Sequence, residues 1–241
     1  IEYSDPNDFG RVTKGAALAL KSRVLLYKAS PLFGTPSTEK WQAAANAAKA
    51  VFDLNKYYLK TVNNSEEYGA LFYDVKNPEV IFEKLFDPKY GSGDNNSFLY
   101  QAPCGIGNGF QGWGNFNPTQ NLVDKFQMAD GTASEKKTHY DYYPWNGREI
   151  RFYAAFLLDG DEWGYGKDKR EVEVYYGGDE TMPAGKDSNW GEYWWNASNT
   201  GYSMRKFLDP SYDATGTTMH TTPWFFIRLS EIYLNYAECQ I

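Results

Sequence analysis

The chain has 241 residues, of which 42% are hydrophobic and 18% aromatic, and its formal net charge is -7. This length suffices for one large domain or two small ones, and the composition excludes a disordered or membrane-spanning chain. No apolar run approaches the roughly 18 residues of a transmembrane helix. The negative charge disfavours nucleic-acid backbones and anionic membrane surfaces, so a neutral partner fits better than a polyanion.

The first part of the chain, from residue 10 to about residue 55, has helical patterns. GAALALKSRVLLYKASPLF carries Ala and Leu on nearly every side, which is typical of a helix packed on more than one face. After a break at GTP, STEKWQAAANAAKAVFDLN places apolar residues at helical spacing and polar residues opposite them. Ser37 or Thr38 can cap this second helix, and Glu39 is favourable in its first turn. The short connection predicts that the two helices are antiparallel neighbours.

The middle of the chain, from residue 79 to about residue 222, differs in character: it holds six of the eight tryptophans and most of the 22 glycines. EVIFEKLF and EVEVYY predict short strands. NPTQNLVDKFQM predicts a short helix opened by Asn117 and Pro118. The rest is turn-rich connection, and loops of this length in a compact domain are usually functional or disordered. The many aromatic residues argue against disorder.

The end of the chain returns to a helical pattern. Thr222 and Pro223 are typical of the N-cap and first residue of a helix. An apolar stripe then follows at helical spacing, formed by Phe225, Leu229, Ile232, Tyr233 and Tyr236. The termini, IEYSDPNDFG and YLNYAECQI, predict that the chain is a piece of a longer protein, and its two cysteines predict no disulfide framework.

Seven stretches, taken in order, resemble the SusD/RagB family of outer-membrane nutrient-binding lipoproteins. They are GRVTKGAALALKSRVLLYKASPLF, KWQAAANAAKAVFDLNKYYL, NPEVIFE, NPTQNLVDKFQMADGT, EIRFYAAFLLDGDEW, TGYSMRKFLDP and PWFFIRLSEIYLNYAE. They span nearly the whole chain. Ala48 and Phe52 also match one element of a tetratricopeptide repeat, although the first-helix element of that repeat is lacking.

The resemblance implies a mainly α fold, in which tetratricopeptide-like helix pairs carry a long irregular, aromatic-rich insert with short strands. Residues 1–78 would form the helical tetratricopeptide-like portion and residues 79–222 the irregular ligand-binding insert. Residues 223–241 would begin a further tetratricopeptide-like helix, all within a single domain. Family members lie on the outward-facing surface of the outer membrane, held by a lipid on an N-terminal Cys that this chain does not contain. They cap a SusC-like TonB-dependent transporter and capture oligosaccharides for import.

Aromatic residues in the insert are the candidates for contact with such a ligand. A pyranose ring has an apolar C–H face that a flat aromatic ring can cover, while flanking polar side chains bond its hydroxyl groups. The loop NWGEYWWN and the stretches NGFQGWGNFN and YYPWNGRE offer both ingredients. The predicted ligand-binding residues are Trp113, Asn115, Trp145, Asn189, Trp190, Tyr193, Trp194 and Trp195.

The alternative for each ring is packing against its neighbours to hold a loop-rich region together. Trp194 and Trp195 are adjacent, so in an extended segment their rings would face opposite sides. At most one of these two rings is then expected to contact the ligand. Trp145, which has Arg148 close by, is a secondary candidate that could instead belong to the core.

Catalytic and metal-binding patterns are lacking. The carboxylates of DGDEWGYGKDKRE lie in turn-like sequence, which predicts a solvated acidic turn with ordinary pKa values rather than a glycosidase acid. Its opening resembles a calcium loop, but Trp163 stands where an oxygen ligand is needed. His139 and His220 are too few and too isolated for a zinc site. The sequence therefore predicts a protein that is not an enzyme and that has no cofactor or metal.

The resulting hypothesis is non-catalytic binding of an oligosaccharide or polysaccharide at the cell surface, with delivery to a TonB-dependent transporter. The aromatic, Asn-rich insert supports glycan binding, and the import role depends on the resemblance alone. Three alternatives stay open: a glycan-active hydrolase, a helical-repeat scaffold that binds only protein, and a binder of peptide cargo. No nucleic acid is expected as a partner, and a membrane only through the lipid anchor.

Overall fold

The computed structural model describes residue 3 and residues 8–87, 112–134, 145–164, 169–177, 181–192, 194–211 and 221–241. The chain divides into two compact units. The first, here called the helical unit, consists of Ile1–Thr61, Asp74–Leu85 and Pro223–Ile241. The second, the insert unit, consists of Val62–Tyr73 and Phe86–Thr222. The division into residues 1–78, 79–222 and 223–241 and the tetratricopeptide-like character of the helices stay predictions.

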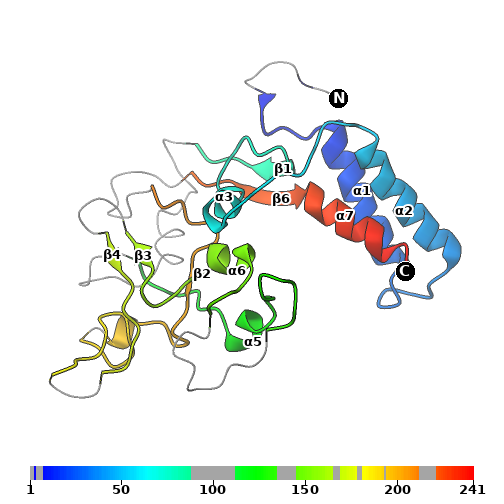
Figure 1. Ribbon diagram of the computed structural model, residues 1–241. Coiled ribbons are helices and arrows are strands. Elements are labelled where there is room, and N and C mark those ends of the chain that lie inside the picture. The colour runs from blue at the N-terminus through cyan, green and yellow to red at the C-terminus, as the bar shows by residue number, and fades with distance from the viewer. Residues whose placement is uncertain are drawn as a thin grey trace. The chain divides into compact units, whose positions relative to one another are not determined.

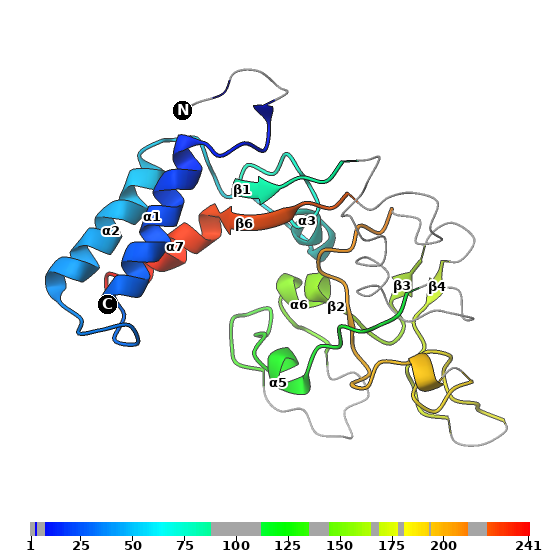
Figure 2. The same cartoon turned by 180° about the vertical axis from the view of Figure 1, so that it is seen from behind.

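Two long helices, α1 (Lys14–Ala29) and α2 (Thr38–Phe52), lie side by side in the helical unit (Figures 1 and 2). Each begins at a residue whose hydroxyl accepts a backbone amide hydrogen bond, Thr13 in α1 and Ser37 in α2. Ser37 is one of the two caps predicted for α2, and Glu39 lies in the first turn as expected. The buried side of α2 is mainly alanine, which lets the two helix backbones approach closely.

A two-stranded antiparallel sheet and a third helix complete the helical unit. Strand β1 (Val80–Lys84), predicted from EVIFEKLF, pairs with β6 (Trp224–Arg228), and β6 runs directly into α7 (Leu229–Glu238). The core between these elements is Ala19, Ala48, Val51, Ile81, Ile227, Leu229 and Ile232. Arg23 of α1 holds α7 in place, because its Nε and Nη2 donate to Glu231 Oε1 and Oε2, each at 2.6 Å.

The prediction that Thr222 and Pro223 open the last helix is wrong. The segment Trp224–Arg228 is a strand, and the helix begins at Leu229. Its aromatic and β-branched residues suit a strand, and β1 supplies a partner for its backbone groups. The amide of Leu229 then donates to Glu79 O at 2.7 Å, which joins the start of α7 to the residue before β1.

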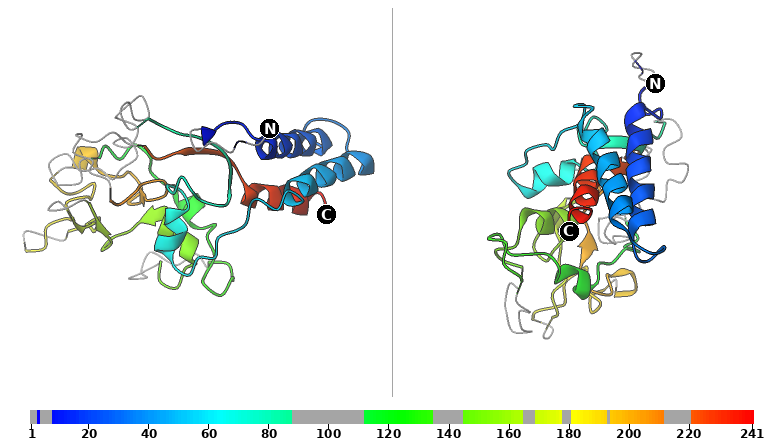
Figure 3. Two further views of the ribbon diagram at one scale, coloured as in Figure 1. Left: turned by 90° about the horizontal axis from the view of Figure 1, so that it is seen from above. Right: turned by 90° about the vertical axis from the view of Figure 1, so that its right-hand side faces the viewer.

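The insert unit is built from short elements joined by long connections (Figure 3). Its helices are α3 (Ser65–Ala70), α5 (Gln120–Val123), α6 (Ile150–Ala155) and one turn of 3-10 helix, η3 (Trp194–Asn196). Two antiparallel pairs of two-residue strands are described: β2 (Phe156–Leu157) with β5 (Ser203–Met204), and β3 (Glu162–Trp163) with β4 (Arg170–Glu171). A helix-rich fold with a few short strands was expected, and the described residues have it.

Two small hydrophobic cores stabilise the insert unit. One consists of Leu157, Trp163, Val172 and Leu208. The other consists of Val123, Phe152, Ala155, Phe156 and Leu158. Aromatic rings dominate the second core, and Phe126, Phe152 and Phe156 meet edge to face with centroids 5.0–6.1 Å apart.

Two local predictions for this unit need correction. The short helix of NPTQNLVDKFQM begins at Gln120, with Thr119 rather than Asn117 as its N-cap. EVEVYY is not a strand throughout, since β4 ends at Glu171 and residues 172–177 have no regular structure. Backbone amides of this segment donate instead to side-chain carboxylates, as Glu173 does to Asp187 and Val174 to Asp159. Its Tyr175 carbonyl oxygen accepts the amide of Gly185 in the loop that follows.

Candidate functional site

Three of the predicted tryptophans belong to one loop and are exposed there. The exposed fraction is 70% for Trp190, 63% for Trp194 and 59% for Trp195. A tryptophan side chain usually ends up largely buried, so three exposed tryptophans within six residues are unusual. The side chains of Trp190, Trp194 and Trp195 are thus mostly exposed to solvent.

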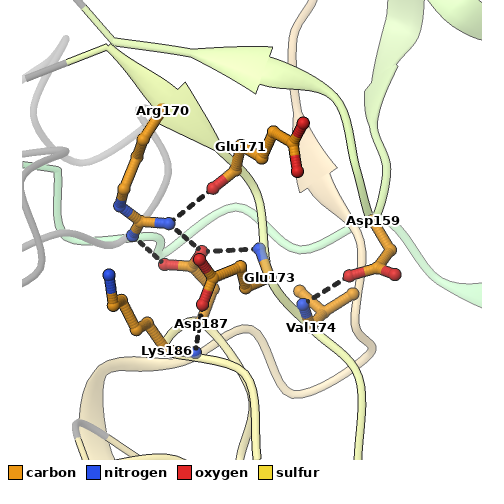
Figure 4. A network of polar contacts seen from close by, with 7 residues as sticks. All are labelled: Asp159, Arg170, Glu171, Glu173, Val174, Lys186 and Asp187. Carbon is orange, nitrogen blue, oxygen red and sulfur yellow. Dashed lines mark hydrogen bonds and ion pairs between the residues drawn. The ribbon is translucent and has the colours of Figure 1, made fainter.

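The base of the loop is fixed to residues 170–177 by a polar network (Figure 4). Arg170 donates from Nη1 and Nη2 to the two carboxylate oxygens of Asp187, both at 2.8 Å. Asp187 Oδ2 also accepts the amide of Glu173 at 2.9 Å, and the Asp187 amide donates to Glu173 O at 2.8 Å. Asp187 is 8% exposed, so this bidentate pair is shielded from water and is stronger than a surface ion pair.

Close backbone contacts also stabilise the loop. The amides of Ser188, Gly191 and Trp194 donate to carbonyl oxygens three residues earlier, at 3.0–3.2 Å. The hydroxyl of buried Ser188 accepts the amide of Trp190 at 3.0 Å. A Cβ on Gly191 would lie 2.3 Å from Gly185 O, so only glycine fits there without movement. The loop therefore has a defined conformation although it contains almost no regular structure.

The backbone at Trp194 and Trp195 differs from the predicted extended segment. Both residues belong to η3, in which successive side chains are about 120° apart around the helix axis. The prediction that at most one of the two rings contacts the ligand assumed an extended segment, whereas this segment is a 3-10 helix and both rings are exposed. Which of them contacts a ligand stays a prediction.

Tyr176 is a further member of this surface that the sequence reasoning missed. Its ring meets that of Trp190 edge to face, with centroids 5.2 Å apart and an angle of 84° between the planes. The Tyr176 side chain is 66% exposed. The residue was assigned to a strand in EVEVYY, and only the fold of the loop brings it against Trp190. We call Tyr176, Trp190, Trp194 and Trp195 the aromatic surface.

The other predicted site residues have different surroundings. Asn189 is exposed next to Trp190, and Tyr193 lies outside the described residues. Trp113 is 38% exposed and Asn115 is exposed. Trp145 is only partly exposed: it packs against the core that contains Phe152, and its carbonyl oxygen accepts the hydroxyl of Tyr153 at 2.7 Å. Trp145 therefore contributes to packing in the insert unit.

The acidic turn around residues 159–162 is more ordered than predicted. Asp159 Oδ1 accepts the amide of Val174, and Asp161 Oδ2 accepts the amide of Leu158. Burial raises the pKa of Asp161, which corrects the expectation of an ordinary value. Trp163 is buried at 6% exposure. No group of three or more potential metal ligands occurs among the described residues.

A mainly apolar pocket of about 420 Å³ also lies in the insert unit. Its walls include Phe72, Phe116 and Phe156, with Arg151 and Lys206 as its cations. Glu149 binds the Arg151 guanidinium through both carboxylate oxygens, and Lys206 Nζ lies 4.2 Å from the centre of the Phe72 ring. None of the site residues predicted from the sequence lines this pocket. Within the described parts of the chain, no helix is long and apolar enough to cross a membrane.

Comparison with solved structures finds similar folds. A SusD-like protein from Bacteroides fragilis is 28% identical, with a TM-score of 0.75 over 99% of this chain and 45% of that one. A SusD-like carbohydrate-binding protein from the same species is 23% identical, with a TM-score of 0.70 over 98% of this chain and 41% of that one. A third structure, determined with a xylogluco-oligosaccharide, is 18% identical, with a TM-score of 0.61 over 99% and 41%.

The chain thus spans less than half of the length of each of these structures. A comparison with curated proteins found no match. The model of the SusD family matches residues 78–241, more than half of the chain, which agrees with the resemblance seen in the sequence. This chain belongs to the SusD family.

Proposed function

We propose that this protein binds an oligosaccharide or polysaccharide without catalysis, through the aromatic surface. The observation that carries the proposal is the display of Trp190, Trp194 and Trp195 on a loop held by the buried Arg170–Asp187 pair. Because the backbone of the loop is held in place before binding, little of its conformational freedom is lost when a sugar stacks on its rings. Exposed Asn189 lies beside them and offers donors and an acceptor to sugar hydroxyl groups.

The buried carboxylate at the base of the loop, Asp187, is bonded in a way that suits a structural role. Both oxygens of Asp187 are bonded to Arg170, and one also accepts a backbone amide. A glycosidase needs two carboxylates placed across one sugar, whereas both oxygens of Asp187 are already occupied by protein donors. Asp187 therefore contributes to the structure of the loop rather than to a hydrolytic pair of carboxylates.

Family membership supports the wider role in this proposal. The protein would act on the outward-facing surface of the outer membrane, anchored by a lipid, and pass its glycan to a SusC-like TonB-dependent transporter. A SusD-like relative of similar fold is a carbohydrate-binding protein, and another was solved with a xylogluco-oligosaccharide. Co-purification of the full-length protein with such a transporter would test this step separately from glycan binding.

Affinity gel electrophoresis of the full-length protein tests the binding proposal. Gels containing xyloglucan, laminarin, starch or mannan would be run with wild type and with Trp190→Ala, Trp194→Ala and Trp195→Ala. Each ring contributes about 1 kcal/mol, so each substitution should weaken retardation about fivefold. Trp224→Ala is the matched control, since Trp224 is 56% exposed but lies on β6 of the helical unit.

Three outcomes would overturn the proposal in different ways. Retardation that is unchanged in all three variants would place the glycan elsewhere on the protein. Release of reducing ends from a retarded polysaccharide would identify a hydrolase. Absence of glycan binding, with transporter association lost in the tryptophan variants, would identify the loop as a protein-binding surface.

A further inference from the structure

A second, more polar pocket of about 750 Å³ lies in the insert unit, away from the sequence-predicted residues. This volume falls in the range of about 300–1,000 Å³ that is usual for small-ligand sites. The polar and aromatic residues that matter for its chemistry are Glu66, Tyr73, Asp161, Trp163, Lys169 and Arg205. They come from three parts of the sequence, residues 66–73, 161–169 and 205, so only the folded insert unit brings them to one cavity.

Arg205 has a large unused capacity for hydrogen bonding. Its guanidinium group carries five N–H donors. Within the described part of the chain, its one side-chain bond is from Nη1 to Tyr153 O, at 3.4 Å. No described carboxylate lies within ion-pair distance of it. The group is nevertheless half-buried, so it lines the cavity with donors that the protein itself leaves largely unbonded.

Asp161 and Tyr73 add acceptors and a hydroxyl group to the same cavity. The Asp161 carboxylate is bonded through Oδ2 to the Leu158 amide at 2.9 Å, and no described residue donates to Oδ1. The Tyr73 hydroxyl has no hydrogen-bond partner among the residues that the structure describes. Burial raises the pKa of both groups, and the charge of Arg205 opposes both shifts.

The remaining charges of the pocket decide between classes of ligand. Lys169 Nζ and Glu162 Oε2 form an exposed ion pair at 2.8 Å and cancel each other. Glu66, Asp161 and Arg205 remain, so carboxylates disfavour an anion and the guanidinium disfavours a cation. A neutral ligand with several adjacent hydroxyl groups satisfies all three, because each hydroxyl both donates and accepts.

We propose that this pocket binds one neutral pyranose residue, with adjacent hydroxyl groups bridging Arg205, Asp161 and Tyr73. Trp163 and Leu208 supply the apolar part of the wall that a sugar ring also requires. The choice of a sugar over another polyol rests on the proposed function. None of the four residues of the aromatic surface lines this pocket.

Isothermal titration calorimetry of the full-length protein with short neutral sugars tests this inference. The probes are maltotriose, cellotriose, xylotriose and mannotriose, with inorganic sulfate as the anionic comparison. The variants are Asp161→Asn, Tyr73→Phe and Arg205→Gln. Asp161→Asn keeps an oxygen for the Leu158 amide, and Tyr73→Phe removes only a hydroxyl group. Tyr58→Phe is the matched control, because Tyr58 is 66% exposed in the helical unit.

At least one trisaccharide should bind, and Asp161→Asn and Arg205→Gln should each weaken it about tenfold, since each removes hydrogen bonds to a charged group. Tyr73→Phe should weaken it about fivefold, and Tyr58→Phe should leave it unchanged. Tyr73→Phe keeps the test decisive if Arg205→Gln does not fold, as judged by its near-ultraviolet circular dichroism.

The failures of this inference and of the proposed function are distinguishable. Polysaccharide retardation that depends on the aromatic surface, together with trisaccharide affinities equal to wild type in all folded pocket variants, overturns the pocket alone. Binding of sulfate but of no trisaccharide also overturns it, in favour of an anion site. A wild-type protein that binds neither polysaccharide nor trisaccharide overturns both.

Discussion

Glu83 of β1 is predicted to make the protein less stable as the pH rises. Its side chain is buried, and its Oε2 has no hydrogen-bond partner among the described residues. Burial, with a smaller contribution from the charge of Asp74, raises its pKa from 4.5 to about 7. The folded protein therefore binds a proton more tightly than the unfolded chain, so its free energy of unfolding falls between pH 4.5 and about pH 7. At about 1.4 kcal/mol for each pKa unit, the loss reaches about 3 kcal/mol at pH 8.

Glu83→Gln removes this titration while it keeps the size and polarity of the side chain. The variant should match wild type near pH 4.5 and exceed its free energy of unfolding by about 3 kcal/mol at pH 8. Urea denaturation followed by circular dichroism at pH 4.5, 6, 7 and 8 measures the difference. Glu238→Gln, which changes an exposed carboxylate of α7, should show no such dependence. A Glu83→Gln difference that is constant across this pH range would refute the reasoning.

Further changes test the core and the loop. Ile232→Ala should lower the free energy of unfolding by about 3 kcal/mol, because Ile232 is fully buried, and exposed Leu234→Ala should cost well under 1 kcal/mol in urea denaturation. Asp187→Ala breaks the buried ion pair and should cost about 2 kcal/mol, with faster amide hydrogen exchange over residues 185–194. Gly191→Ala forces a Cβ against a backbone oxygen and should weaken polysaccharide retardation, whereas Gly69→Ala, with no atom closer than 4.0 Å, should not.

The sequence was most informative where local signals and burial agree. α1 and α2 are long, their apolar residues repeat at helical spacing, and Ser37 caps α2 as expected. The polar side of α2 is also as predicted: Gln42 bonds Asn46, and Lys49 pairs with Asp53. In such segments the interactions that decide the structure lie within four residues of each other, so periodicity is sufficient to find them.

The errors come from interactions between residues far apart in the sequence. Trp224–Arg228 was predicted as the start of the last helix, whereas it pairs with β1 as a strand, and β1 lies far from it in the sequence. Val174 lies in EVEVYY, whose alternating pattern predicts a strand, yet its backbone amide donates to Asp159 of the acidic turn. Neither partner is visible in a local window of sequence.

The candidate site was found only in part for the same reason. The aromatic composition of the loop predicted it as a binding site. Burial depends on tertiary packing, however, so the sequence could not predict that Trp190 is exposed and Trp163 buried. Tyr176 joins Trp190 through the fold of the loop. The groups of the polar pocket, such as Tyr73 and Arg205, belong to no recognisable motif.

The pairing of β1 with β6 allows the segment between them to differ widely among members of the SusD family. The strands are neighbours in the helical unit although most of the insert unit separates them along the chain. The chain segment between them therefore leaves this two-stranded sheet after β1 and returns to it at β6. The entropy of closing a loop grows only with the logarithm of its length, by about 0.6 kcal/mol for each doubling. The segment between β1 and β6 can therefore lengthen, shorten or be replaced at little cost in the folding free energy of the helical unit. Ligand specificity can change in this way while the helical unit keeps its structure.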